Sequence, residues 1–184
     1  WVFSPTQSPE NTPGNIKSQG TFNATMDVAV AKELLRNTIA ASRELGRNQE
    51  KIPRWQRMLA KMPDYLVDER GMIKEWLTPR LANNDSHRHS SQLYPLYDGM
   101  PDEIARSPEL RAAFRKSIEF KLDNHWRNNQ KGFMSFGLVQ LGQAATSLGD
   151  EELAYRCLTQ LVNRYWLNNL ASMHNHRSLL NMDI

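Results

Sequence analysis

Four of the five histidines in this 184-residue sequence fall in two His-x-His pairs, His87/His89 and His174/His176. Each pair lies in loop-like sequence with an aspartate nearby, Asp85 for the first pair and Asp183 for the second. If the two loops converge, imidazoles and carboxylates form a donor set that suits zinc and similar ions. Two alternatives stay open, a polar pocket in which neutral histidines bind sugar hydroxyls, and solvated loop side chains with no ligand.

Two further segments carry an acid in a setting that suits chemistry on sugars. In Ser8-Pro9-Glu10-Asn11, the proline restricts the local backbone, so that Glu10 can be held in one place. In Lys74-Glu75-Trp76-Leu77, an acid stands beside a large aromatic ring. Such a ring packs on the C–H face of a sugar while the acid binds hydroxyls. The alternative is that Trp76 is a core residue with an exposed neighbour.

Several other kinds of chemistry lack their motifs. The sequence holds no glycine-rich phosphate loop, no Gly-x-Ser-x-Gly elbow and no Cys-x-x-Cys. Its one cysteine, Cys157, lies on an apolar helical face and reads as a core residue. A net charge of +3 and a pI near 9.1 reflect a small surplus of bases, so no nucleic-acid partner is expected. No apolar run reaches the length of a membrane span, so no membrane insertion is expected.

These residues must be positioned by helices, because the apolar spacing is helical wherever it is regular and no segment reads as a strand. The spacing predicts helices over about 24–45, 51–62, 108–122, 133–148 and 151–166. Pro63, Pro79 and Pro95 mark residues 63–107 as a long irregular segment, and loops of that length tend to be functional. In the last helix the predicted buried face comprises Ala154, Cys157, Leu158, Leu161, Val162 and Tyr165. Helix pairs joined by long loops indicate an all-α fold of the α/α toroid type.

Three segments in order give this sequence a family resemblance. They are Ser8-Pro9-Glu10-Asn11, Gly71-Met72-Ile73-Lys74-Glu75-Trp76-Leu77, and the run from His87-Arg88-His89-Ser90-Ser91 to Asp98-Gly99. The chain then closes on Asn181-Met182-Asp183-Ile184. Together they resemble the catalytic domain of glycoside hydrolase family 95, whose members include inverting 1,2-α-L-fucosidases and α-L-galactosidases. The resemblance implies an (α/α)6 barrel.

The resemblance also implies roles for individual residues. Glu10 matches the general acid, and Asp183 matches the aspartate that polarises an asparagine-held water. Arg88 and His89 match a pair that contacts the sugar, and His176 matches a further sugar-binding histidine, although Arg177 competes for that alignment. Glu75 and Trp76 are also predicted to bind substrate, because they combine an acid with an aromatic ring. The chain departs from the family at Gln92, where a histidine is usual, and it lacks the upstream segment that carries the asparagines.

We therefore expect residues 1–184 to be a partial catalytic domain, the second half of a barrel, whose missing N-terminal part is its partner. The expected substrate is a glycan ending in L-fucose or L-galactose, with no cofactor and no metal. This piece alone is expected to be inactive and to expose apolar surface. A secreted, periplasmic or cell-surface location is implied by resemblance only, since no signal peptide is recognisable in these residues. The alternatives are a non-catalytic carbohydrate-binding helical module and a metal-dependent hydrolase built on the His-x-His pairs.

Overall fold

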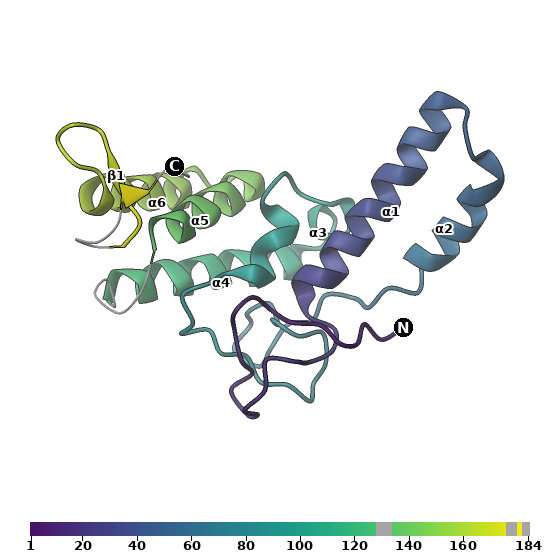
Figure 1. Ribbon diagram of the computed structural model, residues 1–184, viewed down its shortest axis with the longest axis horizontal. Coiled ribbons are helices and arrows are strands. Elements are labelled where there is room, and N and C mark those ends of the chain that lie inside the picture. Colours follow the sequence, from purple (N-terminus) through teal and green to yellow (C-terminus); the bar gives the residue numbers. More distant parts are fainter. Residues whose placement is uncertain (128–133, 176–179, 182–184) are drawn as a thin grey trace.

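The computed structural model describes residues 1–127, 134–175 and 180–181, and the chain is helical through most of its regular structure (Figure 1). The elements are α1 (Thr25–Leu45), η1 (Gln49–Lys51), α2 (Ile52–Leu59), η2 (Ser91–Leu96), α3 (Asp102–Ala105), α4 (Pro108–Arg127), α5 (Ser135–Leu148), α6 (Glu151–Tyr165), β1 (Ser172–Met173) and β2 (Leu180–Asn181). The two short strands pair antiparallel, with Ser172 opposite Asn181 and Met173 opposite Leu180. The predicted all-α fold class is confirmed.

The helix ends follow the signals in the sequence. Gly46 ends α1 and Gly149 ends α5, both in the left-handed conformation that a glycine adopts without steric cost. Asp150 then caps α6, where its side chain accepts a hydrogen bond from the Leu153 backbone N–H at 3.0 Å. Gly149 and Asp150 turn the chain between the two helices, so that α6 packs against α5.

The helices form two groups joined by irregular chain (Figure 1). The helices α1 and α2 make a hairpin at one end of the molecule, and α4, α5 and α6 pack together at the other. Between them, the N-terminal segment and the chain that follows α2 run beside each other on one side. A backbone hydrogen bond from Gly14 to Ala82 joins these two irregular segments, and one from Thr25, the first residue of α1, to Glu75 joins the second segment to that helix.

One apolar core links the two helical groups through the predicted loop region. Leu93 and Leu96 of η2 are completely buried, and η2 packs against both α1 and α5. Phe114 and Ile118 of α4 are also completely buried in the same cluster. Residues 63–107 are therefore not a solvated loop throughout, because η2 lies in the core between the two helical groups.

Apolar side chains remain at the surface of α1 and α6. The predicted burial of Leu158 and Val162 on α6 is wrong, since their exposed fractions are 54% and 44%. On α1, Leu34 is 65% exposed, while Leu35 and Ile39 face the core. Both helices thus carry apolar residues on a second face. No helix in the described part of the chain has the length and apolar character needed to span a membrane.

The position of Phe114 yields a stability prediction. Phe114→Ala removes a completely buried ring that packs edge-on against Tyr65, and it should lower the free energy of unfolding by about 3–5 kcal/mol. Phe120→Ala on the same helix is the matched control, because the Phe120 ring is 37% exposed. This variant should lower the free energy of unfolding by much less. Chemical denaturation measures both, and equal losses would contradict the described orientation of α4.

Candidate active site

The ion pair between Glu10 and Arg88 joins two segments that lie 78 residues apart in the sequence. The Arg88 guanidinium donates to the Glu10 carboxylate, and both side chains reach the surface, with exposed fractions of 33% and 60%. Neither residue lies in a helix or a strand. The pair that the sequence assigned to acid catalysis and sugar binding is thus brought together in an accessible position.

Aromatic rings connect this pair to a third segment of the chain. The His87 and His89 rings lie 5.2 Å apart between centroids, and His89 meets Phe136 of α5 edge-on at 5.7 Å. Phe136 in turn stacks on His174 at 6.1 Å. The loops that carry the two His-x-His pairs therefore converge, at least as far as His174. The predicted site residues His176 and Asp183 lie outside the described residues.

The histidines beside Arg88 are held in the neutral form. Burial, with the charges of His89, Lys121 and Arg88 acting in the same direction, lowers the pKa of His87 to about 4. Burial and the charge of Arg88 also lower the pKa of His89, whose Nε2 atom has no hydrogen-bond partner. A neutral imidazole both donates and accepts, which suits recognition of a hydroxyl group.

Beneath the surface, Glu75 holds the segment that carries Glu10. Glu75 is completely buried, and its two carboxylate oxygens accept hydrogen bonds from Ser8 Oγ at 2.6 Å and Asn11 Nδ2 at 2.7 Å. Because Ser8 and Asn11 flank Pro9-Glu10, both ends of this turn are fixed to one buried carboxylate. Burial raises the pKa of Glu75, while the charge of Lys121 and the two hydrogen bonds act against that shift.

Lys121 of α4 holds the segment that carries Arg88. Its ammonium group donates to the carbonyl oxygen of His87 at 3.0 Å and to that of His89 at 2.6 Å. The residue is 3% exposed, and burial lowers its pKa, while the negative charges of Glu75 and Asp85 act in the opposite direction. Lys121 is not among the residues predicted from the sequence. A signal was present, because it stands three residues after Ile118, on the face that α4 buries.

The η2 segment adds a third attachment to the same turn. Ser91 Oγ donates to the Pro9 carbonyl at 3.1 Å. Gln92, the position at which the sequence departs from the family pattern, is 1% exposed, and neither atom of its amide has a hydrogen-bond partner. The core element η2 therefore supports the Glu10 turn from below.

Two predicted substrate-binding residues lie in the interior. Glu75 and Trp76 are both 0% exposed, and Trp76 Nε1 donates to Thr21 Oγ1 at 3.0 Å. Their polar groups are bound by protein atoms, so neither presents a surface to a sugar in this structure. The reason is that strand-like pairing of Trp76 with Ala24 draws this segment under the start of α1.

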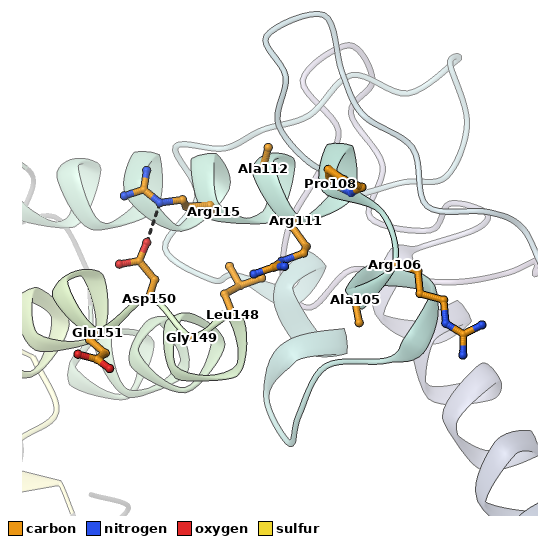
Figure 2. Close-up of a pocket in the computed structure, with 10 residues that line it drawn as sticks. All are labelled: Ala105, Arg106, Pro108, Arg111, Ala112, Arg115, Leu148, Gly149, Asp150 and Glu151. Carbon is orange, nitrogen blue, oxygen red and sulfur yellow. Dashed lines mark hydrogen bonds and ion pairs between the residues drawn. The ribbon is translucent and has the colours of Figure 1, made fainter.

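The cavity drawn in Figure 2 lies away from this ion pair. It has a volume of about 640 Å³ and lies between α3, α4 and the α5–α6 turn, where Arg115 reaches across to Asp150. None of the predicted site residues lines it. Among residues 1–127, 134–175 and 180–181, no three His, Cys, Asp or Glu side chains group closely enough to hold a metal ion.

Comparison with known proteins identifies the family of this chain. Residues 1–183 match the glycosyl hydrolase family 95 catalytic domain, and the chain belongs to this family. Over 164 residues it is 30% identical to alpha-L-fucosidase 2 of Arabidopsis thaliana. That alignment takes in 86% of this chain but 18% of the relative, so the chain spans less than a fifth of that protein.

The low pKa of His87 can be tested by titration. His87 should titrate near pH 4 in the folded protein, against about 6.5 for an unperturbed histidine. NMR of the imidazole C–H resonances measures the midpoint, and His87→Asn assigns the signal. Because the unfolded chain binds the proton more tightly, the free energy of unfolding should decrease as the pH falls from 6.5 to 4. A midpoint near 6.5 would contradict the desolvated environment.

Proposed function

We propose that this chain is part of the catalytic domain of an inverting α-L-fucosidase-like glycoside hydrolase. The observation that carries the proposal is the meeting of Glu10 with Arg88 and the neutral His89, in a chain that belongs to family 95. The named relative, an alpha-L-fucosidase, supports terminal L-fucose as the recognised sugar. L-Galactose, which differs at C6, is the closest alternative.

In the proposed reaction, Glu10 protonates the oxygen of the leaving group as the bond to the anomeric carbon breaks. A water on the opposite face of the ring attacks the same carbon, which inverts its configuration. Asp183 accepts a hydrogen bond from the asparagine that holds this water, which makes the asparagine's amide oxygen basic enough to accept the proton that the water loses. Arg88, His89 and His176 bind sugar hydroxyls. No metal or cofactor is required.

The Arg88–Glu10 pair must change during this reaction. A carboxylate bound to a guanidinium has no proton to give, so the proposal requires the pair to open when the sugar arrives and Glu10 to take up a proton from solvent before the bond breaks. Arg88 then turns to the sugar hydroxyls and leaves Glu10 beside the glycosidic oxygen. The surface position of both side chains leaves room for that exchange.

We further propose that residues 1–184 act together with additional helices in a longer protein. The chain spans 18% of its fucosidase relative, and α1 and α6 each carry apolar residues on an outer face, Leu34 and Leu158 among them. Those helices would complete the barrel and supply the asparagines that hold the water. A glycan substrate agrees with a secreted, periplasmic or cell-surface enzyme.

The acid role of Glu10 predicts a dependence on the leaving group. In the complete protein, Glu10→Ala should abolish most activity on a fucosylated oligosaccharide, whose sugar leaving group needs a proton, with a loss of about 100- to 10,000-fold. The loss should be clearly smaller on an aryl α-L-fucoside with an acidic phenol. The control is Glu44→Ala on the exposed end of α1. Equal losses on the two substrates would contradict the acid role.

The proposed division of the barrel predicts that the 184-residue chain has no turnover by itself. Its acid is present, but the groups that hold the water are not. Purified chain should release no fluorophore from an aryl α-L-fucoside above the rate without protein. Measurable, Glu10-dependent turnover would show that the water-binding groups lie within these residues. A carbohydrate-binding module would instead bind fucosylated glycans and remain inactive as the complete protein.

A further inference from the structure

The ammonium group of Lys121 makes its two hydrogen bonds on either side of Arg88. The acceptors are the carbonyl oxygens of His87 and His89, at 3.0 and 2.6 Å. Through this pair of contacts one rigid helical residue fixes the backbone of a segment without helix or strand structure. The direction in which Arg88 leaves that backbone is set by the same contacts.

Stability alone does not explain why a charged residue is buried at position 121. Burying an ammonium group is costly, and an apolar side chain of similar volume is often as stable or more stable in such a position. Two buried carboxylates offset the cost here, Glu75 at 0% and Asp85 at 6% exposure, and both attract the Lys121 ammonium. What an apolar side chain cannot supply is the pair of hydrogen bonds that hold the two carbonyls.

Glu75, one of these two carboxylates, also binds the segment that carries Glu10. Glu75 accepts from Ser8 and Asn11, which flank Glu10 in the sequence. Asn11 and Asn84 also exchange hydrogen bonds, and this ties the turn to the chain just before His87. A single buried network thus lies under both halves of the Glu10–Arg88 pair.

We propose that Lys121 is a positioning residue that sets the register of Arg88 and His89 against Glu10, while Glu75 holds the segment that carries Glu10 through Ser8 and Asn11. The proposal rests on the proposed function for its catalytic consequence. Its structural part, that Lys121 orders residues 87–89, can be tested without measuring activity. Lys121 itself touches no substrate.

The test uses the complete protein that contains this chain, with three variants. Lys121→Met keeps most of the side-chain volume and removes the donors. Lys116→Met is the matched control, because Lys116 is an exposed lysine on the same helix whose ammonium binds the Arg70 carbonyl, outside both segments. The double variant Lys121→Met with Glu75→Gln removes both of these charges, while Asp85, the other carboxylate near Lys121, keeps its ion pair with Arg70.

Hydrogen–deuterium exchange measures the order of residues 87–89 directly. Exchange in peptides that cover 86–92 should be faster in Lys121→Met than in the unmodified protein, and unchanged in Lys116→Met. The double variant should regain thermal stability relative to Lys121→Met and still exchange fast in these peptides. Unchanged exchange at 86–92 in both Lys121 variants would overturn the proposal.

Kinetics with an aryl α-L-fucoside tests the catalytic consequence. Both Lys121 variants should raise KM and lower kcat, with kcat/KM reduced on the order of 100-fold, because misplaced Arg88 and His89 contact the sugar poorly. A merely structural role would lower the active fraction and leave KM unchanged, and recovery of KM in the double variant would also overturn the proposal. If the unmodified protein hydrolyses no fucoside, the proposed function fails, and the exchange comparison alone decides the role of Lys121.

Discussion

Two buried ionisable side chains, Lys121 on α4 and Glu75 in the segment after α2, hold this molecule's loops in place. The residues that they hold have no regular hydrogen-bonding pattern of their own, so their backbone groups need partners from elsewhere. Lys121 supplies donors to the segment that carries Arg88, and Glu75 supplies acceptors to the segment that carries Glu10. The surface ion pair between Glu10 and Arg88 follows from these two attachments rather than causing them, because an exposed pair is itself worth little.

Most of the helical fold could be predicted from sequence, since apolar spacing and end signals act locally. The predicted helix over 24–45 is observed as α1 from Thr25 to Leu45, and the one predicted over 151–166 is observed as α6 from Glu151 to Tyr165. The errors concern which face is buried. Leu158 and Val162 are apolar yet exposed, because periodicity identifies an apolar side of a helix but not the partner that covers it. The position of η2 in the core was also missed, because a short 3₁₀ segment around Pro95 leaves no helical period.

For the site, the sequence motifs predicted Glu10, Arg88 and His89, and these three residues lie close together in the structure. The motifs carry no information on burial. Glu75 and Trp76 were therefore predicted to bind a sugar, although both lie in the interior. Lys121 was missed for the converse reason. A lysine in a helix reads as solvated, and only the packing of α4 against His87–His89 shows that its ammonium group is enclosed.

The central claim is that Glu10 and Arg88 face the same sugar. The most direct measurement is a crystal structure of the complete protein, with Glu10→Gln to prevent turnover, bound to a fucosylated oligosaccharide. The ion pair should then be replaced by contacts from Arg88 to sugar hydroxyls, with residue 10 about 2.6–3.2 Å from the glycosidic oxygen. A sugar bound elsewhere, with Arg88 making no contact to it, would contradict the assignment of this site.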